Sequence, residues 1–76
     1  MGRLSIDEEA VLNRINKWLV KRGQHCRRSE SQRARRLLGR AFIVDLETNE
    51  VLDRDVDLEA LARELEVLAP SERMGR

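Results

Sequence analysis

The sequence contains few of the residues on which small extracellular domains and membrane proteins depend. Cys26 is the only cysteine among 76 residues, so no disulfide can form within the chain. Small secreted domains commonly rely on several disulfides, and we therefore expect a reducing, cytoplasmic environment. No apolar run precedes the acidic residues 7–9, and none approaches the ~20 residues of a membrane-spanning helix. We accordingly expect neither a signal peptide nor a membrane span.

Aromatic residues are also scarce, because Trp18 and Phe42 are the only two. Both fall at predicted core positions, which disfavours recognition of single-stranded nucleic acid by stacking of bases on aromatic rings. A chain of this length buries only ~60% of its unfolded surface, and small scaffolds often associate to supplement a thin core. We therefore expect a homodimer.

A capping pattern and an apolar stripe predict the first helix. Ser5 and Glu8 have the spacing of a capping box, so we expect the helix to begin at Ile6. Gly23 supplies a left-handed residue at its end. The apolar stripe consists of Val11, Ile15, Trp18 and Leu19.

The segment after Gly23 shows no apolar period, and residues 23–29 are predicted as a loop. Ser29 and Gln32 form a second capping pattern, which predicts a short arginine-rich helix ending at Gly39. Two helices followed by a hairpin resemble the helix-turn-helix family with a wing. The loop is longer than the three or four residues typical of that turn, so no base-reading role is assigned.

The second half of the sequence predicts a hairpin and a last helix. Residues 42–44 and 51–52 are rich in strand formers, and Asn49 suits the left-handed position of the turn. Asp57 can cap a helix that Pro70 closes. The apolar face of this helix consists of Leu58, Leu61, Ala62, Leu65 and Leu68.

These elements predict an α+β fold in the order α-α-β-β-α, with a two-stranded antiparallel hairpin packed on helices. We expect one domain over residues 1–70 and a disordered C-terminal tail over residues 71–76.

The charges of the two halves are opposed, although the net charge is only +1. Residues 1–40 carry 11 Lys or Arg against 4 Asp or Glu, whereas residues 41–76 carry 4 against 10. Arginine outnumbers lysine in the basic half, and its planar fork suits bidentate contact with phosphate. If the first two helices are neighbours, their cations form one patch that can bind a nucleic-acid backbone.

We therefore predict a small non-enzymatic binding module. The expected contacts to the nucleic-acid backbone, without base specificity, are Arg14, Lys17, Lys21, Arg27, Arg28, Arg33, Arg36 and Arg40. Two other interpretations remain open for these cations: a solvated surface, or internal pairing with the acidic half.

The acidic half supports an alternative function, in which the chain is an adaptor or small inhibitor that binds a partner protein. The expected partner-binding residues lie on the hairpin and are Asp45, Glu47, Glu50, Asp53 and Asp55. The last helix adds further carboxylates.

No pattern in the sequence predicts catalysis, a cofactor or a metal. His25 and Cys26 are the only conventional base and nucleophile, no third orienting group is identifiable, and one of each cannot fill a zinc site. A calcium-loop spacing of acidic residues fails because Leu58 occupies the position that requires glycine. The residues with that spacing are Asp53, Asp55, Asp57 and Glu64.

Overall fold

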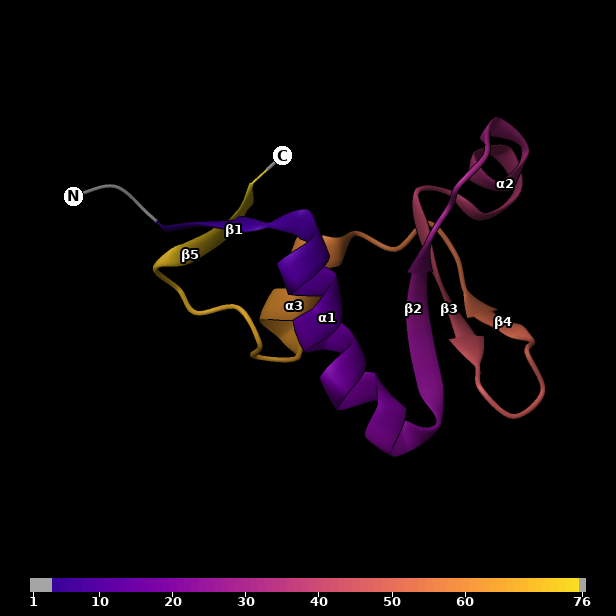
Figure 1. Cartoon of the computed structure of the whole chain (residues 1–76), viewed down its shortest axis with the longest axis horizontal. Coiled ribbons are helices and arrows are strands. Elements are labelled where there is room, and N and C mark those ends of the chain that lie inside the picture. The colour runs from indigo at the N-terminus through magenta and orange to yellow at the C-terminus, as the bar shows by residue number, and fades with distance from the viewer. Residues whose placement is uncertain (1–3, 76) are drawn as a thin grey trace.

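The computed structural model describes residues 4–75 and shows a mixed α+β domain with helices and two small sheets (Figure 1). The class predicted from the sequence is confirmed, but the described residues contain more strands than the predicted hairpin. The elements are β1 (Leu4–Asp7), α1 (Glu8–Leu19), the 3-10 turn η1 (Val20–Arg22), β2 (Gln24–Arg28), α2 (Gln32–Leu38), β3 (Ala41–Asp45), β4 (Val51–Asp53), α3 (Leu58–Glu64) and β5 (Glu72–Gly75).

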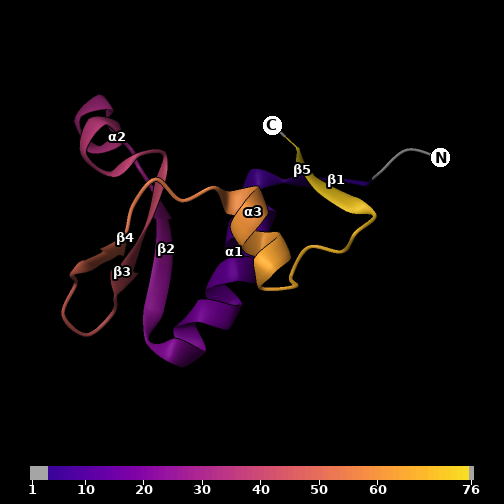
Figure 2. The same ribbon diagram turned by 180° about the vertical axis from the view of Figure 1, so that it is seen from behind.

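Helix α1 lies at the centre of the molecule and contributes to the core along one face. In both views it lies between the pair β1 and β5 on one side and the three-stranded sheet on the other, and α3 overlaps it (Figures 1 and 2). Val11, Ile15 and Leu19 are buried on it at helical spacing, as predicted, whereas Trp18, the fourth residue of the predicted stripe, is only partly buried. The rest of the buried cluster consists of Cys26, Ala41, Ile43, Leu58, Ala62 and Leu68.

The start of α1 differs from the prediction. Ser5 lies in β1 rather than in a capping box, and the helix begins at Glu8 instead of Ile6. Asp7 occupies the N-cap position without a side-chain capping bond. Pairing of β1 with a distant strand overrides the local capping pattern. Gly23 adopts φ 73° after η1, as the sequence predicts.

The predicted loop over residues 23–29 is wrong, because Gln24–Arg28 form strand β2. The three-stranded sheet has the antiparallel order β2-β3-β4, with Cys26 opposite Ile43. Cys26 is the one buried residue of β2, which explains why the sequence shows no clear strand pattern there.

Asn16 of α1 covers part of the outer edge of β2. Its Oδ1 accepts a hydrogen bond from the Cys26 backbone N–H at 2.7 Å, and its Nδ2 donates to the Cys26 carbonyl at 2.9 Å. The side-chain amide thus satisfies the two backbone groups that a further strand would bind. This contact joins the sheet to the central helix.

The hairpin between β3 and β4 has the predicted left-handed Asn49, with φ 63°. Val44 lies opposite Val51, but Ile43 lies opposite Asp53, so Leu52 is the extra residue of a β-bulge. Asp45 organises the turn, since its Oδ1 accepts hydrogen bonds from the N–H groups of Glu47 and Thr48.

Helix α2 projects from the end of the sheet and has no buried residue. Ser31, rather than the predicted Ser29, caps it by accepting a hydrogen bond from the Ala34 N–H at 3.0 Å. Ser29 is buried and donates to the Gly39 carbonyl, which ties the two ends of the segment together. Gly39 ends the helix with φ 77°, as the sequence predicts.

The last helix and the C-terminal segment also differ from the prediction. Asp57 caps α3, as expected, but the helix ends at Glu64, and Glu66 follows with φ 60°. Where the sequence predicts a disordered tail, Glu72–Gly75 form β5, which pairs in parallel with β1. Residue 76 of that predicted tail lies outside the described residues.

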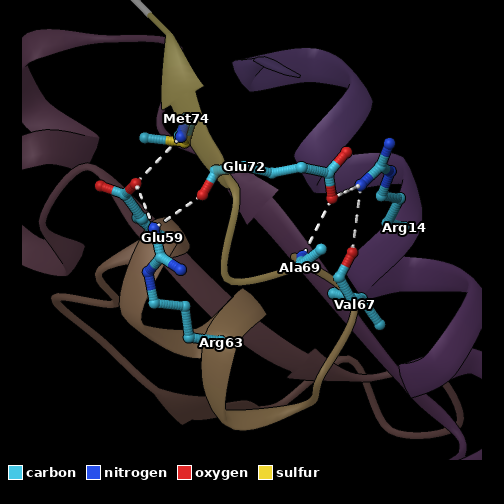
Figure 3. Close-up of polar contacts among 7 residues, drawn as sticks. All are labelled: Arg14, Glu59, Arg63, Val67, Ala69, Glu72 and Met74. Carbon is cyan, nitrogen blue, oxygen red and sulfur yellow. Dashed lines mark hydrogen bonds and ion pairs between the residues drawn. The ribbon is translucent and has the colours of Figure 1, made fainter. Parts of the chain in front are cut away.

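Side chains of α3 hold β5 in place (Figure 3). Glu59 Oε2 accepts a hydrogen bond from the Met74 N–H, and Arg63 donates to the Glu72 carbonyl at 2.8 Å. These contacts satisfy strand groups that β1 does not reach.

No helix within residues 4–75 is long and apolar enough to cross a membrane.

Candidate nucleic-acid interface

A groove of about 1080 Å³ runs along the outer edge of β2 between the start of α1 and helix α2. Four arginines line it, namely Arg27, Arg28, Arg35 and Arg40. The other polar or charged residues of the lining are Asp7, Glu8, His25, Ser29, Glu30 and Ser31. Arginines from β2, from α2 and from the position just before β3 therefore line one concave surface.

The strand geometry explains how β2 supplies two of these cations. Successive side chains of a strand point to opposite faces, so Arg27 and Arg28 flank the strand at its C-terminal end. Arg27 lies opposite Phe42 and Arg28 opposite Ala41 in the sheet register. Phe42, which the sequence places in the core, is only half-buried and lines the groove.

Arg28 is the groove arginine with an internal partner among the described residues. Its Nη1 lies 3.0 Å from Glu8 Oε1, and the pair is exposed. The hydrogen bond to Glu8 raises the pKa of the guanidinium. Glu8 and Asp7 thus offset the charge of Arg28, whereas the other three arginines of the lining outnumber Glu30, the carboxylate that precedes α2.

Arg14 is withdrawn from the predicted basic surface. Its Nη1 lies 2.9 Å from Glu72 Oε1 and donates to the Val67 carbonyl at 3.2 Å (Figure 3). Glu72 also accepts a hydrogen bond from the Ala69 N–H at 2.9 Å. These bonds, that from Arg14 foremost, lower the pKa of the Glu72 carboxyl. Arg14 therefore fastens the C-terminal segment to α1.

The remaining predicted cations are divided between two ends of the molecule. Lys17 and Lys21 are exposed near the C-terminal end of α1, which lies far from α2 in both views (Figures 1 and 2). Nearby, the guanidinium carbon of Arg22 lies 4.0 Å from the centroid of the Trp18 ring. Arg33 and Arg36 are exposed on α2 but do not line the groove. The single patch expected across the first two helices is therefore split.

The cations at the α2 end are not paired within the described chain. Its ion pairs join Arg14 to Glu72, Arg28 to Glu8 and Arg63 to Glu59. Internal neutralisation by the acidic hairpin, which the sequence left open, does not occur among residues 4–75. The exposed arginines on or beside α2 are Arg27, Arg33, Arg35, Arg36 and Arg40.

Most carboxylates of the predicted partner-binding set lie on the hairpin and are exposed. Glu47 and Glu50 lie in the turn, and Asp53 lies in β4. Asp45 is half-buried and holds the turn together, while Asp55 adopts φ 54° beside Gly39. Glu47, Glu50 and Asp53 are thus the members of this set that are best placed to meet another molecule.

His25 and Cys26 do not face each other, because they are successive residues of β2 and their side chains point to opposite faces. Cys26 is fully buried, and burial raises the pKa of its thiol to about 11. The thiol is therefore protonated near neutral pH and a poor nucleophile. Within the described ranges, no three metal-ligating side chains converge.

Comparisons with known proteins returned no family model, no curated protein and no solved structure that matches this chain.

Proposed function

We propose that this chain is a small non-enzymatic module that binds the phosphate backbone of nucleic acid through the groove between β2 and α2. The observation that supports the proposal is that Arg27, Arg35 and Arg40 line one groove and form no ion pair within the described chain. The contacts are to phosphates, so the module binds without reading base sequence.

The composition of the groove suits an extended anionic ligand more than an apolar one. A guanidinium can donate two parallel hydrogen bonds to one phosphate, and several at fixed spacing follow a backbone. Ser31 adds a hydroxyl to the lining of the same groove. Trp18 is unsuited to stacking on bases because Arg22 covers its ring. A duplex or a structured-RNA backbone is therefore the proposed ligand.

Binding of labelled DNA and RNA duplexes by fluorescence anisotropy, at increasing salt, tests this proposal. Each phosphate contact releases a counterion, and for B-DNA the slope of log affinity against log salt is about −0.9 per contact. The triple variant Arg27→Ala, Arg35→Ala, Arg40→Ala should bind weakly, with a slope about 2–3 units shallower than that of the wild type.

A matched control separates a groove effect from a change in net charge. Lys17→Ala, Lys21→Ala, Arg54→Ala removes the same number of cations from exposed positions outside the groove. It should retain most of the affinity. Failure of the wild type to bind either duplex at low salt, or an equal loss in the control, contradicts the proposal.

A further inference from the structure

One face of α2 is unpartnered in the described structure. Arg33, Arg36 and Leu37 recur at helical spacing on the side that does not line the groove, and Leu37 is 61% exposed. We name these three residues the α2 outer face. A helix of seven residues is too short to be stable in isolation, and α2 buries none of its residues. Contact with another surface would stabilise it.

A second unpartnered surface lies on the hairpin. Leu46, Val51 and Leu52 are 46%, 39% and 48% exposed, and the bulge at Leu52 displaces that residue from regular pairing. Glu47 and Glu50 flank these apolar residues, and together the five form the hairpin surface. It combines exposed apolar side chains with negative charge at a sheet edge, which is the composition of an interaction site.

We propose that the hairpin surface of one chain binds the α2 outer face of a second copy, so that the protein forms a twofold-symmetric dimer. The two surfaces have opposite charge, and the α2 outer face exposes one large apolar side chain whereas the hairpin surface exposes three. Arg33 and Arg36 of one copy then face Glu47 and Glu50 of the other, while Leu37 packs against Leu52. The proposal is independent of the nucleic-acid groove, which contains none of these residues.

The arrangement of the two surfaces within one chain supports a symmetric contact. Helix α2 and the turn between β3 and β4 lie at opposite ends of the three-stranded sheet in both views (Figures 1 and 2). A twofold axis between two such sheets places each α2 beside the hairpin of the other copy. Each contact is then made twice, as in closed dimers generally, and no surface is left to propagate a chain.

Sedimentation velocity over a range of protein concentration and salt tests the dimer. The expected mass is twice the 8.9 kDa of one chain, and the dissociation constant should rise with salt because the contact is electrostatic. Charge reversal of either surface, as Arg33→Glu with Arg36→Glu or as Glu47→Arg with Glu50→Arg, should weaken the dimer about tenfold or more.

Combining both reversals in one chain is the decisive variant. The combined chain again has complementary surfaces, so it should dimerise within about threefold of the wild type. Effects on folding are separated from effects on association by far-UV circular dichroism. Leu52→Ser should also weaken the dimer, whereas Val20→Ser, which alters an exposed apolar residue on η1, should not.

A wild-type chain that is monomeric at all accessible concentrations overturns the proposal. So does a combined variant that remains monomeric although each reversal alone disrupts the dimer. A dimer that survives both separate reversals must use another surface, and that result also contradicts the contact. Duplex binding is scored separately with the groove variants, so failure of one proposal leaves the other standing.

Discussion

Replacement of Asn16 should strongly destabilise the fold, because its amide makes two hydrogen bonds to the backbone of the fully buried Cys26. Asn16→Leu removes both partners and leaves a buried N–H and a buried carbonyl unsatisfied. Each such group costs about 1–3 kcal/mol, so the two together should cost about 2–6 kcal/mol. Domains of this size have about 5–10 kcal/mol of stability, so the loss is a large fraction of it.

Chemical denaturation followed by the fluorescence of Trp18, the only tryptophan, measures this loss. In thermal unfolding the same change should lower Tm by about 8 °C or more, because 1 kcal/mol corresponds to about 4–8 °C in a domain of this size. Hydrogen exchange at the Cys26 amide should accelerate in the variant, because the bond that protects it is lost. Asn13→Leu is the matched control, since Asn13 is exposed on the same helix. It should change stability by less than about 1 kcal/mol.

Asn16→Asp adds a pH-dependent test of the same contact. The aspartate can accept from the Cys26 N–H, but only its protonated form can donate to the Cys26 carbonyl. We therefore expect its pKa in the folded state to exceed the unfolded value of ~3.9. The carboxylic acid should support the fold fully below that unfolded value, and the support should be lost as pH rises through the folded pKa. If Asn16→Leu and Asn16→Asp were both as stable as the wild type at neutral pH, this contact would not be important for the fold.

Three further predictions concern the C-terminal segment, the glycines and the thiol. Because the pKa of Glu72 is lowered in the folded state, its carboxylate stabilises the fold at pH values above the unfolded pKa of ~4.3, and this stabilisation is lost as pH falls through the folded pKa. The difference in stability between the wild type and Glu72→Gln should therefore shrink as the pH is lowered in acid denaturation. Gly39→Ala places a methyl group 2.7 Å from the Asp55 Cα and should lower the free energy of unfolding by about 2–4 kcal/mol. At Gly23 an added methyl group meets no atom within 4 Å, so Gly23→Ala should lower it by only about 1 kcal/mol, and urea titration measures both. Cys26, with its pKa raised to about 11, should react with a disulfide reagent about a hundredfold more slowly in the folded chain than in urea, and equal rates would contradict its burial.

Local signals predicted the elements whose stability depends on nearby residues. The stripe of Val11, Ile15 and Leu19 was sufficient for α1, and Asn49 identified the turn of the hairpin. Asp57 was recognised as a cap because its partner, the Ala60 N–H, lies three residues away. These patterns repeat at the spacing of the helix or turn itself, so no distant contact is needed to interpret them.

The missed strands depend on partners far along the chain. Strand β5 contains one large apolar residue, Met74, and is held by β1 and by the side chains of Glu59 and Arg63. Strand β2 is similarly polar and is defined by pairing with β3 and by the Asn16 amide. The sequence pattern of these segments carries no sign of such contacts, since strand preference depends strongly on the surrounding structure.

The candidate interface was predicted in composition but not in extent. The sequence identified Arg27, Arg28 and Arg40 as candidate phosphate contacts, and the structure places them on one groove with Arg35. It could not show that Arg14 pairs with Glu72, which lies 58 positions away. Nor could it show that α2 lies far from the C-terminal end of α1, near which Lys17 and Lys21 are found.

The sequence by itself determined the helical stripe, the hairpin turn, the cap at Asp57, and the separation of basic from acidic residues along the chain. The tertiary structure decided which cations are free, because pairing requires proximity in space and a guanidinium reaches only a few ångströms. It also created the groove, since strand β2 exists only where α1 and β3 cover it. Caps and turns are determined by neighbouring residues. The composition of a surface instead depends on which distant segments the packing of the core brings together.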